Sequence, residues 1–446
     1  MKKRILILLP LIIIGAGLFY IGTLAPIITG YAAKNLASGI FVAGRTQESL
    51  EKEDLNFSFI SFNRNAVDLK KKEVTSQFLF WKSKAIYLDG FGCTLVRDFS
   101  EEEIRNRPYQ VVPLPEVSPD TIPWPMGDLL SDTLPSGIDM ERINRQLDSA
   151  LSNSLPMKGT FAVAVAYKNQ LIAERYRDGF SSKNLFLSWS MAKSITNALT
   201  GIMVQKGMYD INNETGIPDW QSDNRKEITT AHLLNMTSGL EWNEDYGSNS
   251  DVNKMLFKTG DMAAFAKAKP AENKPDEVWK YSSGTTNLVC KVLRDAINND
   301  STYYAFPRKE LFNRIGMRSA IFEVDPSGTF IGSSYVYATM RDYVRFGLLY
   351  LNKGIWNGEQ ILPDYWTDFT AVPASASEGA YGAFFWLNRD NTYPGVPADM
   401  YCCRGHDGQF IYIIPSKELV VVRTGFSKNG EFDSKSFLRG IVESVK

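Results

Sequence analysis

Two pairs of alternating apolar segments, far apart in the chain, constrain the fold most. Residues 159–179, GTFAVAVAYKNQLIAERYRDG, and residues 408–426, GQFIYIIPSKELVVVRTGF, each alternate in the way of two strands joined by a short polar turn. Helical spacing precedes the first pair at 139–153 and follows the second at 432–446. Between them, helical patterns dominate. We therefore predict an α+β domain, an antiparallel sheet flanked by helices with an inserted helical subdomain.

The chain before this domain divides into three parts. Lys2, Lys3 and Arg4 precede a run without charge from Ile5 to Ala33, which predicts a membrane-spanning helix and a cytoplasmic amino terminus. The division we expect is an anchor over 1–24, a small strand-rich region over 25–104, a proline-rich linker over 105–130 and the main domain over 131–446. We expect a single-pass protein of the bacterial inner membrane with its main domain in the periplasm. Cleavage of the segment as a signal peptide is the alternative.

A serine and a lysine three residues apart stand where a helix is expected to begin. In LSWSMAKSITNAL, residues 187–199, Ser190 and Lys193 would lie on one helix face, within contact of each other. The positive potential of a helix amino terminus and burial among apolar residues would both lower the pKa of Lys193. A neutral amine could then take the proton of Ser190, which would attack a carbonyl and form an acyl-enzyme. The other interpretation is a solvated lysine on a surface helix.

Two further polar groups occur at the edges of predicted elements. Tyr281-Ser282-Ser283 precedes a helical run, and His406-Asp407-Gly408 comes where the second hairpin begins. In this order and spacing the three segments resemble the motifs of the serine β-lactamase and D,D-peptidase superfamily: Ser-x-x-Lys, then Tyr-x-Asn or Tyr-x-Ser, then Lys-Thr-Gly or His-x-Gly. The resemblance covers nearly all of 131–446. Within the superfamily the chain looks most similar to esterases and 6-aminohexanoate-dimer hydrolases related to class C β-lactamases.

The resemblance implies a role for each matching residue. Ser190 would be the nucleophile, Lys193 its base partner and Tyr281 a proton shuttle. The backbone amides of Ser190 and Gln409 would form the oxyanion hole, and Ser283, His406 and Gly408 would contact the substrate. Class C β-lactamases carry asparagine at the position of Ser283 and lysine at that of His406, where they help to hold the β-lactam. Their replacement favours a short ester or a small linear amide as substrate.

Other classes of function are less well supported by the sequence. The net charge of −1 leaves no basic surplus for nucleic acid. A Ser-His-Asp hydrolase would need one of only two histidines, of which we interpret His232 as structural, and no Gly-x-Ser-x-Gly elbow occurs. We expect no cofactor. We also expect no metal, because the candidate zinc ligands Cys402, Cys403 and His406 are poorly spaced for tetrahedral coordination. Two alternative functions stay open, a D-amino peptidase that acts on cell-wall peptides and a penicillin-recognising sensor. The oligomeric state is also open.

Overall fold

In the computed structural model the two predicted hairpins lie side by side in one sheet. The structure describes residues 2–428 and 430–446, and of residues 2–14 and 16 it describes the backbone alone. The sheet has the order β12-β13-β14-β15-β5-β6, and all of its neighbouring pairs are antiparallel. Its strands are β5 (Thr160–Tyr167), β6 (Gln170–Tyr176), β12 (Trp386–Leu387), β13 (Tyr401–Gly405), β14 (Gln409–Ile414) and β15 (Leu419–Gly425). The pairing of β15 with β5 joins the two ends of the domain, so the predicted α+β arrangement is confirmed.

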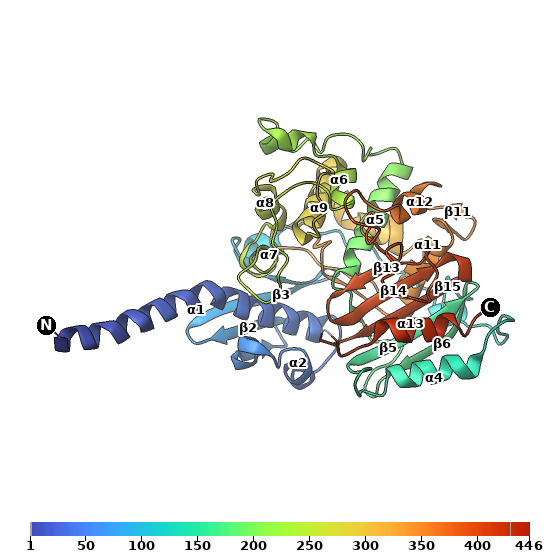
Figure 1. Ribbon diagram of the computed structural model, residues 1–446, viewed down its shortest axis with the longest axis horizontal. Coiled ribbons are helices and arrows are strands. Elements are labelled where there is room, and N and C mark those ends of the chain that lie inside the picture. The colour runs from blue at the N-terminus through green and yellow to red at the C-terminus, as the bar shows by residue number, and fades with distance from the viewer. Residues whose placement is uncertain (1, 429) are drawn as a thin grey trace.

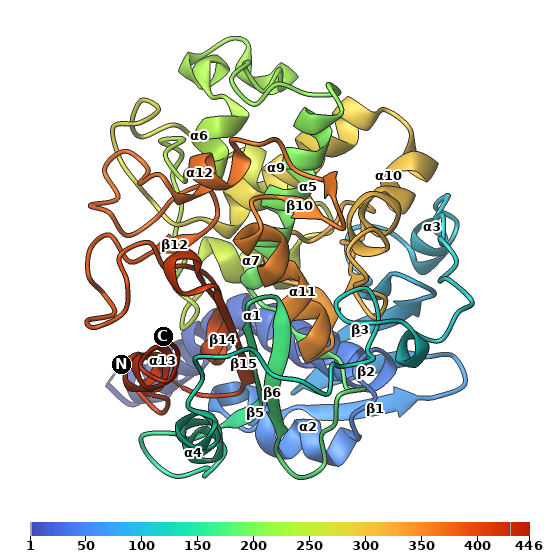
Figure 2. The ribbon, with the colours of Figure 1, turned by 90° about the vertical axis from the view of Figure 1, so that its right-hand side faces the viewer.

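Helices cover both faces of this sheet (Figures 1 and 2). The helices α4 (Met140–Ala150) and α13 (Ser434–Val442) pack on one face, where they share a core with Val163 and Val165 of β5. The helices α5 (Met191–Gln205) and α11 (Met340–Leu351) pack on the other face, against the alternate side chains of the same strand. A Cβ on Gly347 of α11 would lie 2.6 Å from Val420, so this glycine permits close approach of helix and sheet.

The predicted helical insertion lies between β6 and β12. It contains α6 (Thr230–Leu234), α7 (Asp251–Lys258), α8 (Met262–Lys267), α9 (Ser283–Ile297), α10 (Asp300–Phe306), a π-helical turn (Pro307–Phe312) and α12 (Trp366–Ala371). Short strands run through the same region: β7 (Phe186–Leu187), β8 (Ile321–Phe322), β9 (Val336–Ala338), β10 (Ile355–Trp356) and β11 (Glu359–Gln360). In a separate three-stranded sheet, β9 lies between β7 and β8 and pairs with both. Because β7 ends shortly before α5 begins, this sheet holds the start of α5 close to β9.

The amino-terminal region is a four-stranded antiparallel sheet with a long helix across it. The strands are β1 (Arg64–Asp68), β2 (Glu73–Phe78), β3 (Trp81–Leu88) and β4 (Gly92–Leu95), in the order of the chain. The helix α1 (Lys2–Phe41) contacts β2, β3 and β4, and also α7 of the main domain (Figure 1). The short helices α2 (Gln47–Glu53) and α3 (Glu101–Arg105) complete the region.

The predicted membrane anchor, and with it the inner-membrane localisation, is wrong. Within the residues that the structure describes, no helix is both long and apolar enough to cross a bilayer. The part of the predicted segment over residues 1–14 and 16 lies outside the described side chains. From Ala25 onward the apolar side chains instead pack inside the protein, and Ala25, Ala32 and Leu36 are fully buried. The later part of the charge-free run, from Ala25 to Ala33, thus belongs to the protein core, which favours the same apolar composition as lipid.

A buried ion pair fixes α1 to the main domain. Lys34 pairs with the carboxylate of Glu323, and both side chains are almost fully buried. Glu323 also accepts hydrogen bonds from the hydroxyl of Ser38 at 2.8 Å and from the backbone amide of Cys93 at 2.6 Å. Glu323 directly follows β8, so the helix and the amino-terminal sheet are both attached to the segment that leads to the candidate site.

Candidate active site

Ser190 lies at the amino-terminal end of α5. Its side chain makes no capping hydrogen bond to the helix, and the residue is 8% exposed. Trp189, directly before it, has a φ of +44°, a conformation that is costly for a large side chain and that concentrates at functional sites. The tight turn therefore places the Ser190 hydroxyl at the edge of the core without using it as a helix cap.

Lys193 contacts Ser190 one helical turn further on. Its Nζ lies 3.0 Å from the Oγ of Ser190, 3.0 Å from the Oγ of Ser283 and 2.9 Å from the carbonyl oxygen of Ser333. Burial lowers the pKa of Lys193 from 10.5 to about 8, because a charged ammonium loses its hydration there, while the negative charge of Glu244 opposes this shift. A substantial minority of the amine is therefore neutral at physiological pH, whereas an ordinary lysine is almost entirely charged. The alternative of a solvated surface lysine does not describe this residue.

Glu244 is a member of the cluster that the sequence prediction missed. Its carboxylate accepts hydrogen bonds from the backbone amide of Ser283 at 2.9 Å, from the hydroxyl of Ser283 at 2.5 Å and from Trp242. Ser283, which is 1% exposed, therefore connects Glu244 with Lys193. We predicted that Ser283 contacts the substrate, and the structure places its hydroxyl between these two charged groups. Nothing in the sequence around Glu244 distinguishes it from a surface glutamate.

Two tyrosines surround the serine and the lysine. The ring centre of Tyr281 lies 4.9 Å from Nζ of Lys193. Burial raises the pKa of Tyr281 well above its ordinary value, and interaction with the Ser190 hydroxyl opposes this rise. Tyr246, which the sequence analysis did not single out, donates a hydrogen bond to Glu244 at 2.7 Å, and burial raises its pKa too. Both phenols therefore keep their protons near neutral pH, which makes Lys193 the better base.

The His406-Asp407-Gly408 segment forms the turn between β13 and β14. A Cβ on Gly405 would lie 2.3 Å from the carbonyl oxygen of Ser188, so this end of the sheet lies against the segment before Ser190. The ring of His406 is 4.7 Å from that of Tyr246, centre to centre. Gly408 has a φ of +85°, and its carbonyl accepts a hydrogen bond from Arg423 at 2.6 Å. The turn geometry therefore requires a glycine at this position.

Gln409, the first residue of β14, directs its side chain away from the serine. Its amide group bonds to the backbone of Gly425 on β15, with the carbonyl oxygen 3.0 Å from the amide of Gly425. The backbone of Gln409 stays at the edge of the sheet that faces the start of α5. His232 lies elsewhere, where its Nδ1 accepts a hydrogen bond from the amide of Thr229 and helps to cap α6.

Two cavities meet at Ser190, one of about 410 Å³ and one of about 390 Å³. Both are lined by Ser190, Tyr246, His406 and Asp407, and only the second also by Tyr281.

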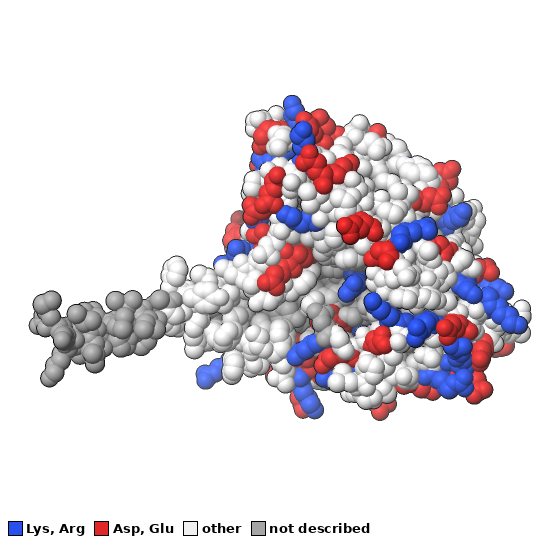
Figure 3. All heavy atoms as spheres, in the orientation of Figure 1, with Lys and Arg blue, Asp and Glu red and all other residues white. Residues whose placement is uncertain are grey.

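Charged side chains of both signs are mixed over the face of the molecule that Figure 3 shows.

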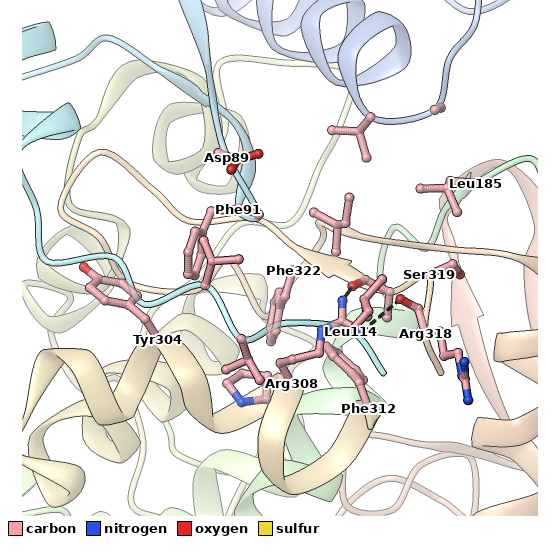
Figure 4. A pocket seen from close by; sticks show the side chains of 18 of the residues that line it. Asp89, Phe91, Leu114, Leu185, Tyr304, Arg308, Phe312, Arg318, Ser319 and Phe322 are labelled. Carbon is pink, nitrogen blue, oxygen red and sulfur yellow. Dashed lines mark hydrogen bonds between the residues drawn. The ribbon is translucent and has the colours of Figure 1, made fainter. Parts of the chain in front are cut away.

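A third cavity, of about 620 Å³, lies between the linker and the main domain and does not include Ser190 or Lys193. Phe91, Leu114 and Phe312 line it (Figure 4). Arg308 and Arg318 also border it, but their guanidinium groups donate to backbone carbonyls, that of Arg308 to Met317 and that of Arg318 to Val117. We therefore place the chemistry at Ser190 despite the larger volume here.

The cysteines do not take part in this cluster. Cys93, Cys290, Cys402 and Cys403 are free and buried, and burial raises the pKa of each thiol. Across residues 2–428 and 430–446, as far as their side chains are described, no three His, Cys, Asp or Glu residues are arranged to hold a metal ion. The buried thiols stay protonated and contribute to packing.

An antiparallel sheet with an inserted helical region, and a serine in contact with a buried lysine, define a hydrolytic enzyme that acts through a serine. Residues 157–436 match the Beta-lactamase family, so the chain belongs to that family, and the resemblance seen in the three motifs is confirmed.

Comparisons with individual proteins agree with this assignment. The 6-aminohexanoate-dimer hydrolase of Paenarthrobacter ureafaciens is 20% identical over 296 residues, which cover 59% of this chain and 72% of the relative. A putative 6-aminohexanoate-dimer hydrolase from Bacillus anthracis has a similar structure, with a TM-score of 0.57 and 20% identity over 75% of this chain and 89% of its own. A putative β-lactamase from Bacteroides dorei gives a TM-score of 0.54 and 15% identity over 69% of this chain and 99% of its own. At these identities the structural matches show a shared fold.

Proposed function

We propose that the protein hydrolyses short esters or small linear amides through an acyl-enzyme formed on Ser190. The observation that carries this proposal is the contact of Ser190 with Lys193, a buried amine whose pKa falls to about 8. A lysine held in this way has a far larger neutral fraction near neutral pH than a solvated lysine, and only the neutral amine can accept a proton.

In the mechanism that we propose, each of these groups has one role. The Oγ of Ser190 attacks the carbonyl carbon while the amine of Lys193 takes the hydroxyl proton. The amides of Ser190 and Gln409 stabilise the negative oxygen of the tetrahedral intermediate. Tyr281 passes a proton to the leaving alcohol or amine as the bond to the carbonyl breaks, and Lys193 restores its proton. Water then repeats the sequence on the acyl-enzyme and releases the acid.

Two observations support an ester or a linear amide as the substrate. One relative is named as a 6-aminohexanoate-dimer hydrolase. In addition, Ser283 is engaged with Lys193 and Glu244, and a histidine stands at 406, so neither position offers the asparagine or lysine that the motif resemblance associates with β-lactam binding.

The test is the intact mass of the full chain after exposure to a fluorophosphonate, p-nitrophenyl acetate and a penicillin. We expect one fluorophosphonate adduct on the wild type and none on Ser190→Ala, with ester turnover and little penicillin labelling. Ser248→Ala, which alters an exposed serine near the site, is the matched control and should keep the adduct. Stable penicillin adducts without ester turnover would instead support a sensor or a wall-peptide peptidase, and full activity of Ser190→Ala would refute the mechanism.

A further inference from the structure

The helix α1 forms a wall of the cavity of about 410 Å³ beside Ser190. Leu24, Ile27, Ile28 and Tyr31 of α1 line it. The lining continues with apolar side chains of other segments: Phe57, Ile60, Leu256, Phe257 and Phe426. The wall thus comes from a region that precedes the part of the chain matching the family, residues 157–436.

This wall is held firmly against the main domain. A Cβ on Gly30 would lie 2.8 Å from the carbonyl oxygen of Phe257, so α1 and α7 approach each other closely at this glycine. The ring of Tyr31 stacks on that of Trp189 at 6.3 Å between centres, next to the nucleophile. The buried pair of Lys34 with Glu323 fixes the position of α1 one turn further on. The cavity is therefore preformed, and the wall that α1 supplies to it is apolar.

The residues of the cavity of about 390 Å³ indicate which part of a substrate would enter the cavity of about 410 Å³. Tyr281 and Arg404 line the cavity of about 390 Å³ and do not line the cavity of about 410 Å³. If Tyr281 supplies the proton of the leaving group, the leaving group lies on that side of the scissile bond. The acyl group then extends to the other side of Ser190, into the cavity that α1 lines.

We propose that the substrate carries an aliphatic acyl chain, which lies against α1 in this cavity. The inference rests on the proposed function, since it assumes an acyl-enzyme on Ser190, and it adds the class of acyl group that the site selects. The chain would be recognised by removal of its methylene groups from water, a contribution that grows with the number buried.

The experiment compares kcat/KM for p-nitrophenyl acetate, butyrate and hexanoate, using the full chain. For the wild type we expect an increase of about fourfold for each added methylene. Leu24→Asp places a carboxylate in the cavity, and Ile28→Trp fills it, so both should flatten the series and lower kcat/KM for hexanoate far more than for acetate. The matched control is Tyr20→Asp, at a residue of the same helix that is 63% exposed. It should retain the wild-type series.

The outcomes separate this inference from the proposed function. If acetate hydrolysis depends on Ser190 but kcat/KM does not rise with acyl length, the hydrolase mechanism stands and the acyl site is wrong. A rise that both α1 substitutions leave unchanged would also overturn it. If kcat/KM instead grows with the alcohol part in a series of acetate esters, the orientation of the substrate is reversed. If the wild-type protein does not hydrolyse p-nitrophenyl acetate, the proposed function is refuted.

Discussion

Glu244 accepts two hydrogen bonds from Ser283, one from the backbone amide at 2.9 Å and one from the hydroxyl at 2.5 Å. The same hydroxyl lies 3.0 Å from Nζ of Lys193. A single small side chain therefore separates a carboxylate from the candidate base. The charge of Glu244 raises the pKa of Lys193, whereas burial lowers it. The balance of these two effects sets the pH at which the amine becomes neutral.

Replacing Glu244 with glutamine should shift the pH dependence of hydrolysis to lower pH. The wild-type kcat/KM should rise with pH through about 8, because only the neutral amine of Lys193 accepts the proton. Without the negative charge the pKa of Lys193 falls further, and the midpoint should move down by up to about one unit. The measurement is kcat/KM for p-nitrophenyl acetate from about pH 6 to about pH 10. Glu227→Gln, at an exposed glutamate, should show the wild-type midpoint. An unchanged or higher midpoint in Glu244→Gln would contradict the coupling.

Replacing Lys193 with methionine should lower kcat/KM by a factor of about 10² to 10⁴, the usual contribution of a general base. Adding Ser190→Ala to Lys193→Met should cost little more, since two groups that act as one unit lose function together. Lys226→Met removes an exposed lysine and serves as the control. Additive losses in the double variant would show that the two residues act independently.

Replacing Tyr281 with phenylalanine should affect substrates according to their leaving group. Burial holds the pKa of Tyr281 well above neutrality, so the phenol is a proton donor. An amide or alkyl ester needs a proton on its leaving group, whereas p-nitrophenolate leaves readily without one. We expect a loss of about 10²-fold for an anilide and a loss of less than about tenfold for a p-nitrophenyl ester. Tyr365→Phe, at a tyrosine that is half exposed, is the control. Equal losses on both substrates would argue against proton donation by Tyr281.

Replacing Lys34 with methionine should destabilise the protein. The carboxylate of Glu323 would stay buried without its cationic partner, which costs about 3–5 kcal/mol in comparable pairs. The double variant Lys34→Met with Glu323→Gln removes both charges and should recover part of this loss. Urea unfolding followed by tryptophan fluorescence measures both values. A double variant that is less stable than Lys34→Met would show that hydrogen bonds of Glu323, and not the charge pair, dominate here.

The sheet and its covering helices could be predicted because each has a strong local pattern. The strands β5 and β15 alternate clearly, and α4 and α13 have one apolar face each. The same holds for Ser190 and Lys193, whose contact follows from helical spacing alone. The order of the motifs in the chain then indicated the family without any knowledge of the loops.

The missing parts of the prediction are those that depend on contacts between distant segments. Glu244 became visible only through its position next to Ser283, and Tyr246 only through its bond to Glu244. For α1 the prediction rested on the charge-free run from Ile5 to Ala33, whose later residues, such as Ala25 and Ala32, would suit lipid and a protein core equally well. Whether lipid or protein surrounds these residues depends on the packing of β2 and β3 against α1. The sequence predicts strands in this region but does not show which helix they pack against.

The close approach of α1 to α7 at Gly30 has a practical consequence for anyone who redesigns this enzyme. The groups that break the bond and the surface that would choose the acyl chain come from separate stretches of the chain. Substitutions at Leu24 or Ile28 could then retune selectivity while the reactive serine stays untouched. Trimming the chain to its family-matching core, residues 157–436, would discard this means of control together with α4 and most of α13, which cover one face of the sheet.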